Sequence, residues 1–143
     1  MANEIDPEAM LLLLAEQIYP LENLNNLRKN FTANRTNQAD ASGWTPLALA
    51  VVRRMNMDLI RLLLELGAAP DVENEAGDTA MFLAIEDDYE YMVLELAWHA
   101  DPTFVSSNGD SSLSVAKWFG NSRIVSRLES MGFQDTGRLL ICI

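Results

Sequence analysis

Apolar positions along this chain fall into short blocks of helical length, separated by polar segments that contain glycine or proline. Three blocks open in the same way, with a glycine, a hydroxyl residue two positions later, and an apolar run that ends on alanine. They are GWTPLALA at 43–50, GDTAMFLA at 77–84 and GDSSLSVA at 109–116. The glycines are 34 and 32 residues apart, and a second apolar stretch follows each block. A period of about 33 residues with a turn and two helices predicts an all-α repeat structure.

Local signals predict where these helices begin and end. Thr45 can cap the first helix of its unit through its hydroxyl, and Pro46 presets the backbone of the first turn. The second helix, around 59–64, is expected to end at Gly67 in the left-handed conformation. In the second unit, Ala80 replaces the proline and His99 stands where a terminating glycine is expected. We therefore expect this unit to be less rigid at both points.

The third unit keeps the glycines at all three positions, and both ends of the chain depart from the pattern. Its glycines are Gly109, Gly120 and Gly132, at the motif, the turn between the helices and the helix end. Residues 1–33 predict two short helices without the glycine motif, which suits an N-terminal capping unit. The last ten residues, 134–143, end in five apolar residues and are expected to cover the open side of the last unit, with insertion into a partner as the alternative.

The three blocks resemble the G-x-T-P-L-x-x-A motif of ankyrin repeats over residues 41–133, and residues 1–40 are similar in architecture alone. The resemblance implies a single all-α ankyrin-repeat solenoid of about four helix-turn-helix units. Its expected parts are a divergent cap (1–40), repeats at 41–74, 75–106 and 107–133, and the tail. The family's usual histidine after T-P-L is replaced by Ala48, Phe82 and Ser114. The resemblance thus implies weaker ties between adjacent turns, with the same fold.

The charge balance is strongly acidic. The 143 residues carry 21 Asp and Glu against 10 Lys and Arg, a net charge of −11. This charge disfavours direct binding to nucleic acid and suits a basic protein partner. From residue 62 to 116 there are twelve acids and no Lys or Arg. Because uncompensated charge lowers stability, we expect these acids to serve a partner rather than only to solvate the surface.

Compartment signals are few. Cys142 is the only cysteine, so no internal disulfide can form. The chain starts with acidic residues where a secretion signal needs positive charge, and its apolar run at 9–15 is too short to span a membrane. We expect a cytoplasmic protein that makes no contact with membranes.

Carried over position by position, the resemblance implies a partner-binding concave surface. It consists of turn tips beside the motif glycine and of residues that follow the last alanine of each first helix. Ser42, Val52 and Asn108 belong to it, and the residues expected to make the binding contacts are Trp44, Arg53, Glu75, Asp78, Glu86, Asp87, Tyr89, Asp110, Trp118 and Phe119. Trp44 is expected at an exposed turn tip as the best single anchor, and packing on the adjacent turn is the alternative for an aromatic residue there. For Trp118 and Phe119, core and interface positions both remain open.

The residue inventory argues against catalysis. His99 is the only histidine, so no Ser-His-Asp set or histidine-rich metal site can form. The acidic run at 86–88 lacks the ligand spacing of a calcium loop, and a solvated turn is the simpler interpretation. We therefore expect a protein without enzymatic activity, metal or cofactor.

These observations favour a protein-binding module. The first hypothesis is an inhibitor or immunity protein that neutralises a basic partner, such as a bacterial toxin, as a monomer in a heterodimeric complex. The alternative is an ankyrin-type adaptor or scaffold in a signalling or regulatory complex.

Overall fold

The protein forms three stacked helix pairs over the residues that the structure, a computed structural model, describes, 36–135. The six helices in this range are α4 (Pro46–Val52), α5 (Met57–Glu65), α6 (Ala80–Glu86), α7 (Glu90–Ala97), α8 (Ser112–Trp118) and α9 (Ser122–Ser130), and the range contains no strand. The all-α repeat fold is therefore confirmed. The predicted cap lies outside the described residues up to residue 35, and so does the predicted tail from residue 136.

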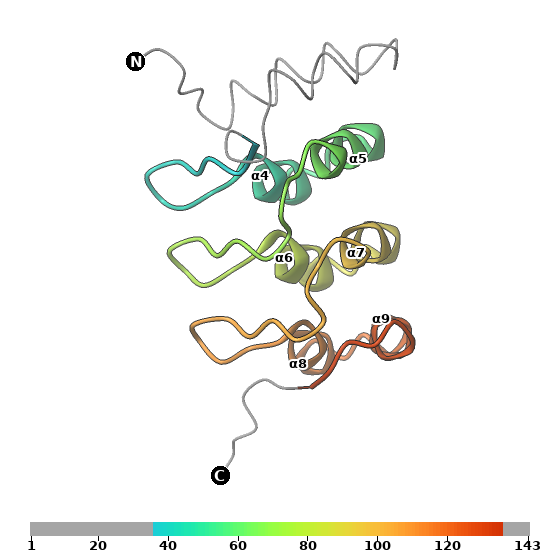
Figure 1. Ribbon diagram of the computed structural model, residues 1–143. Coiled ribbons are helices and arrows are strands. Elements are labelled where there is room, and N and C mark those ends of the chain that lie inside the picture. The colour runs from blue at the N-terminus through green and yellow to red at the C-terminus, as the bar shows by residue number, and fades with distance from the viewer. Residues whose placement is uncertain (1–35, 136–143) are drawn as a thin grey trace, which may run out of the picture.

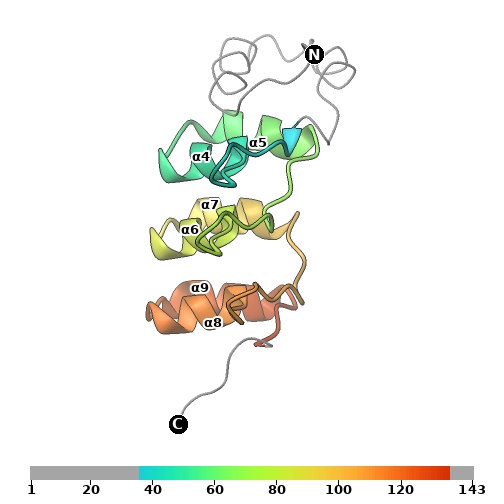
Figure 2. The ribbon, with the colours of Figure 1, turned by 90° about the vertical axis from the view of Figure 1, so that its left-hand side faces the viewer.

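The helix pairs build two layers (Figure 1). α4, α6 and α8 stack as an inner layer, and α5, α7 and α9 stack as an outer layer. The loops that precede the inner helices project away from the outer layer, and they lie one above another when viewed from their own side (Figure 2). Each unit thus presents a projecting loop and an inner helix on the same side of the molecule.

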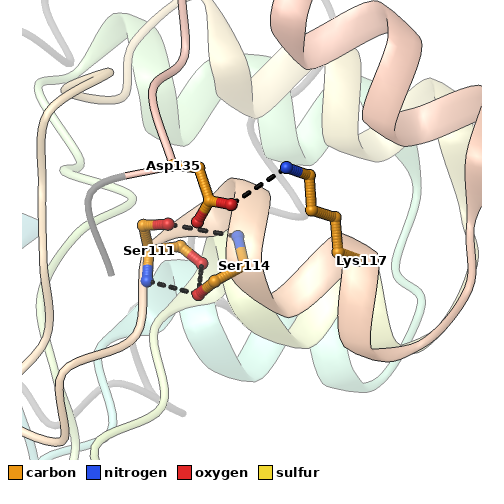
Figure 3. A network of polar contacts seen from close by, with 4 residues as sticks. All are labelled: Ser111, Ser114, Lys117 and Asp135. Atoms are coloured by element: carbon orange, nitrogen blue, oxygen red, sulfur yellow. Dashed lines mark hydrogen bonds and ion pairs between the residues drawn. The ribbon is translucent and has the colours of Figure 1, made fainter. Parts of the chain in front are cut away.

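A side-chain hydroxyl starts each inner helix, and the cap that the sequence predicts at Thr45 is one of the three. The hydroxyl oxygens of Thr45, Thr79 and Ser111 accept hydrogen bonds from the backbone N–H three residues later, at 3.1–3.2 Å. In α8 the hydroxyl of Ser114 also accepts from the backbone N–H of Ser111 at 2.8 Å, which completes a capping box (Figure 3). These bonds satisfy N–H groups that would otherwise have no partner in the first helical turn.

Each projecting loop is closed by a side chain three residues before the motif glycine. Asp40 and Asn74 each accept two backbone hydrogen bonds through Oδ1, and Ser106 accepts one through its hydroxyl. Neighbouring loops are also tied together, because the Asn108 amide donates to the carbonyl of Ala76 at 3.1 Å. Gly43 must be glycine for two reasons: its φ is +86°, and a Cβ there would lie 2.8 Å from the Cα of Asn74.

The outer helices end at the three predicted places, twice with a left-handed glycine and once with His99. Gly67 and Gly132 have φ of +97° and +93°, as expected for helix-terminating glycines. His99 lies just beyond α7 and is exposed, and it does not adopt a positive φ. Its backbone N–H donates to the carbonyl of Leu96, so this helix ends without the left-handed residue.

The core lies between the two layers and between successive units. The motif alanines Ala50, Ala84 and Ala116 are all fully buried, which allows close approach of the neighbouring helices. Large side chains from both layers fill the remaining space, among them Leu47, Ile60, Leu63, Met81, Ile85, Met92, Leu96, Ile124 and Leu128. The repeat therefore buries one continuous core, as a solenoid requires.

Candidate protein-binding cleft

A cleft of about 590 Å³ opens between the second and third units, on the side of the projecting loops and inner helices. Its volume lies within the range of ligand-binding sites. α6 and α8 contribute its walls, and the loops before them contribute one end. The lining residues are Gly77, Asp78, Phe82, Glu86, Asn108, Asp110, Ser114, Val115, Trp118 and Phe119.

Helical periodicity explains why these residues meet. On α6, Phe82 and Glu86 are four residues apart and therefore share one face. On α8, Ser114 and Val115 are followed one turn later by Trp118 and Phe119, at and just after the helix end. Because α6 and α8 pack side by side, the two faces together form the cleft.

The apolar part of the cleft is partly fixed and partly open. Phe82 is 5% exposed, and its ring lies 6.1 Å from that of Phe104, centroid to centroid. Trp118 is 84% exposed and Phe119 is 45% exposed. The structure thus decides the open question about these two residues in favour of the surface. Exposed aromatic side chains of this size are enriched in the centres of protein interfaces.

Three carboxylates line the same cleft. Asp78 and Asp110 lie in the projecting loops, and Glu86 is the last residue of α6. None of the three forms an ion pair with any residue in the range 36–135. Their negative charge is therefore not neutralised by the described part of the chain.

Five of the ten predicted contact residues line the cleft, namely Asp78, Glu86, Asp110, Trp118 and Phe119. The other five do not. Glu75 is exposed in the second loop, Arg53 is exposed at the end of α4, and Tyr89 is half-buried against the core at the start of α7.

The structure corrects the predicted exposure of Trp44. The expected exposed turn tip is wrong, because Trp44 is half-buried and packs against the core. The loop that carries Trp44 is closed on itself by two hydrogen bonds, which Asp40 accepts from the backbone N–H groups of Ser42 and Trp44.

Asp87 is already engaged within the protein. The guanidinium of Arg54 binds it with two hydrogen bonds, Nε to Oδ2 at 2.6 Å and Nη2 to Oδ1 at 2.8 Å. These hydrogen bonds lower the pKa of Asp87 and raise that of Arg54. This ion pair joins the first unit to the second, so Asp87 serves a structural contact rather than an open binding surface.

Sequence reasoning missed the apolar wall of the cleft, in particular Phe82 and Val115. A signal was available for Phe82 and Ser114, which occupy the position of the family's usual histidine. That both side chains turn toward the cleft could have been inferred from their spacing of four residues from Glu86 and Trp118.

Within the described range, no group of three or more His, Cys, Asp or Glu side chains is arranged to hold a metal ion. No helix of that range is long and apolar enough to cross a membrane.

Comparison with known proteins supports the repeat assignment. The family model for ankyrin repeats in three copies matches residues 6–106. A protein of Acanthamoeba polyphaga mimivirus, named as an ankyrin repeat protein, is 34% identical over 79 residues. That match covers 53% of this chain and 14% of the viral protein, so the chain spans a small part of its relative. With the stacked helix pairs and the repeated glycine motif, the match over more than half of its length shows that the chain belongs to the ankyrin-repeat family, a family of protein-binding modules.

Proposed function

We propose that this chain binds a protein partner with a basic surface through the cleft between its second and third units, and that it inhibits the partner by covering that surface. A partner that acts on nucleic acid, such as a bacterial toxin, has a surface of this kind. The observation that carries the proposal is the presence of three unneutralised carboxylates and two exposed aromatic side chains in one cleft.

The distribution of the cations supports this assignment. Three arginines of the outer helices are engaged with acids there: Arg61 with Glu95 at 2.9 Å, and Arg123 and Arg127 with Glu90 at 3.4 and 3.5 Å. None of these three arginines lines the cleft, and the charged residues that do line it are all acids. A negative cleft on a chain of net charge −11 attracts basic partners and speeds their association.

Two variants with equal charge test the proposal. The cleft variant carries Asp78→Asn and Glu86→Gln, and the outer variant carries Glu65→Gln and Glu129→Gln. Each raises the net charge from −11 to −9, but the outer variant changes exposed residues on α5 and α9 that do not line the cleft. Neither Asp78 nor Glu86 forms a side-chain hydrogen bond or ion pair within the described residues, so the cleft variant is expected to fold normally.

The experiment has two steps. The wild-type chain and both variants are used to capture protein from the source organism, and the captured protein is then purified and its affinity and activity are measured. We expect a basic partner whose affinity for the cleft variant is at least about tenfold weaker, unchanged affinity for the outer variant, and loss of activity at a stoichiometric amount of the chain. Equal affinity for the two variants contradicts the proposal.

A second candidate function is an adaptor, and one observation favours it. Tyr91 of α7 and Trp98, which caps the end of that helix, lie seven residues apart and are 78% and 77% exposed. This spacing places both on one face of an outer helix, away from the cleft. An adaptor needs two contact surfaces. Two results together would support the adaptor. The captured partner would stay fully active in the complex, and a third protein would be captured by the wild-type chain but not by the Tyr91→Ser, Trp98→Ser variant.

A further inference from the structure

We infer that the cleft recognises an extended peptide segment of the pattern cation-x-apolar-x-cation, with an arginine at the end near Trp118. This inference rests on the proposed function and specifies the part of the partner that enters the cleft. It follows from the length of the cleft and the order of the chemical groups along it.

The cleft has acidic groups at both ends and an apolar middle. Asp78 and Asp110 precede α6 and α8 in the projecting loops, whereas Glu86 lies at the far end of α6. Between these ends lie the rings and methyl groups of Phe82 and Val115. From Ala80 to Glu86, α6 rises about 9 Å at about 1.5 Å per residue, and the two residues before it each add at most about 3.3 Å, so the two ends are roughly 9–16 Å apart.

An extended chain matches this spacing. It advances about 3.3 Å per residue, and every second side chain points to the same face. Residues i and i+4 are then about 13 Å apart on one face, with residue i+2 midway between them. Cations at i and i+4 can therefore reach the two acidic ends while residue i+2 contacts the apolar middle.

The two acidic ends of the cleft differ in whether they favour arginine over lysine in the bound peptide. The Glu86 end carries Trp118, whose exposed indole can stack on a planar guanidinium while the carboxylate binds its N–H groups. The other end offers two carboxylates, Asp78 and Asp110, without an exposed aromatic ring, which suits lysine as well as arginine. Arginine is therefore expected to be preferred over lysine at one end only.

Fluorescein-labelled peptides test the spacing directly. The matching peptide contains Arg-Ser-Leu-Ser-Arg, a second has the same composition in the order Arg-Arg-Leu-Ser-Ser, and a third replaces the leucine by serine. Binding to the full chain is measured by fluorescence anisotropy at low salt. We expect the matching peptide to bind at least about tenfold more tightly than the other two, because each mismatch leaves one end or the middle of the cleft without its contact.

Protein variants locate the binding. The cleft variant and the Trp118→Ala variant should each bind the matching peptide about tenfold more weakly or worse. The outer variant and Trp98→Ala should leave it unchanged, since Trp98 is as exposed as Trp118 but does not line the cleft. Replacing each arginine of the peptide by lysine in turn should weaken binding at one position only, and that loss should disappear in Trp118→Ala.

The outcomes separate this inference from the proposed function. If the matching and rearranged peptides bind with equal affinity, and the cleft variant binds neither, the inferred spacing is wrong. The proposal that the cleft binds a basic partner then still stands. Affinity that is unchanged in the cleft variant overturns both. If no peptide binds, the inferred pattern is wrong, and the capture experiment decides the proposed function independently.

Discussion

At the scale of single residues, Asn37 and Asp71 show how one atom changes the energetics of equivalent positions. Each lies six residues before its motif glycine. Asn37 accepts a hydrogen bond from the backbone N–H of Ala69 and donates one to the carbonyl of Gly67, both at 2.8 Å. Asp71 accepts from the Asp101 N–H at 2.7 Å, but its buried Oδ1 has no partner among the described residues. An ionised carboxylate cannot make the donation that the Asn37 amide makes.

Asp71→Asn should therefore stabilise the protein at neutral pH. Burial raises the pKa of Asp71, the hydrogen bond from the Asp101 backbone lowers it by less, and the charge of Asp101 adds a smaller increase. With a folded pKa above the unfolded one, the carboxyl favours folding only when protonated, and this contribution is lost as the pH rises through the folded pKa. We expect the free energy of unfolding to rise by about 0.5–1 kcal/mol at pH 7, because the carboxyl is partly screened by solvent.

Urea denaturation at pH 7 and at pH 3 measures this difference, which should shrink at the lower pH. The reverse substitution Asn37→Asp is the control and should lower stability at pH 7. An Asp71→Asn gain that is equal at both pH values would contradict the explanation.

The turns between paired helices supply a second residue-scale prediction. Equivalent positions eleven residues after the motif glycine are all left-handed: Arg54 at φ +51°, Asp88 at +55° and Gly120 at +74°. Adding a Cβ to Gly120 meets no atom within 4 Å, so Gly120→Ala isolates the backbone cost. We expect a loss of about 1 kcal/mol in the free energy of unfolding.

Asp88→Gly should do the opposite and stabilise by about 0.5 kcal/mol, since aspartate tolerates this conformation only partly. Arg54→Gly should gain less, because it also removes the ion pair with Asp87. Thermal unfolding of the three variants checks the order, and a stabilised Gly120→Ala would show that the left-handed turn is not required.

At the scale of elements, the hydroxyl caps control the helices that form the cleft walls. Thr79 is fully buried and its hydroxyl accepts from the Phe82 N–H at 3.1 Å, so it starts the helix that carries Phe82 and Glu86. Thr79→Ala should cost about 1–2 kcal/mol in the free energy of unfolding, and Thr79→Ser much less, because serine keeps the hydroxyl. Amide hydrogen exchange in α6 should rise in the alanine variant before exchange in α4 does. An equal loss in both variants would indicate lost packing of the Thr79 methyl group instead.

At the scale of the whole molecule, charge and aromatic contact should act on different rate constants. The cleft carboxylates attract a basic ligand from a distance, so the association rate should fall at least about tenfold between 50 and 500 mM salt. The cleft variant should lower the association rate at low salt. Trp118→Ala should instead raise the dissociation rate, because the indole contributes after contact is made.

Stopped-flow mixing with the matching peptide, or with the captured partner, measures both rates. The outer variant is the control, and it shares the net charge of the cleft variant. If both variants slow association equally, steering comes from net charge alone and the position of the acids in the cleft has no special effect.

The sequence by itself determined the repeat, its period and most helix ends. Thr45, Gly67 and Gly132 act where the pattern predicts, because capping depends on atoms within four residues along the chain. It also identified the acids and the two exposed aromatic residues of the cleft, since the family resemblance relates position in the repeat to position on the concave side.

Only the tertiary structure decided which of these side chains are available to a partner. Trp44 packs against the core, Asp87 pairs with Arg54 of the preceding unit, and Phe82 joins Trp118 of the following unit in one cleft. Each of these outcomes depends on contacts between residues more than thirty positions apart or on how the loop folds back on the core. Such contacts depend on how each unit is shifted and rotated against the next one. A periodic sequence pattern does not record that shift or rotation.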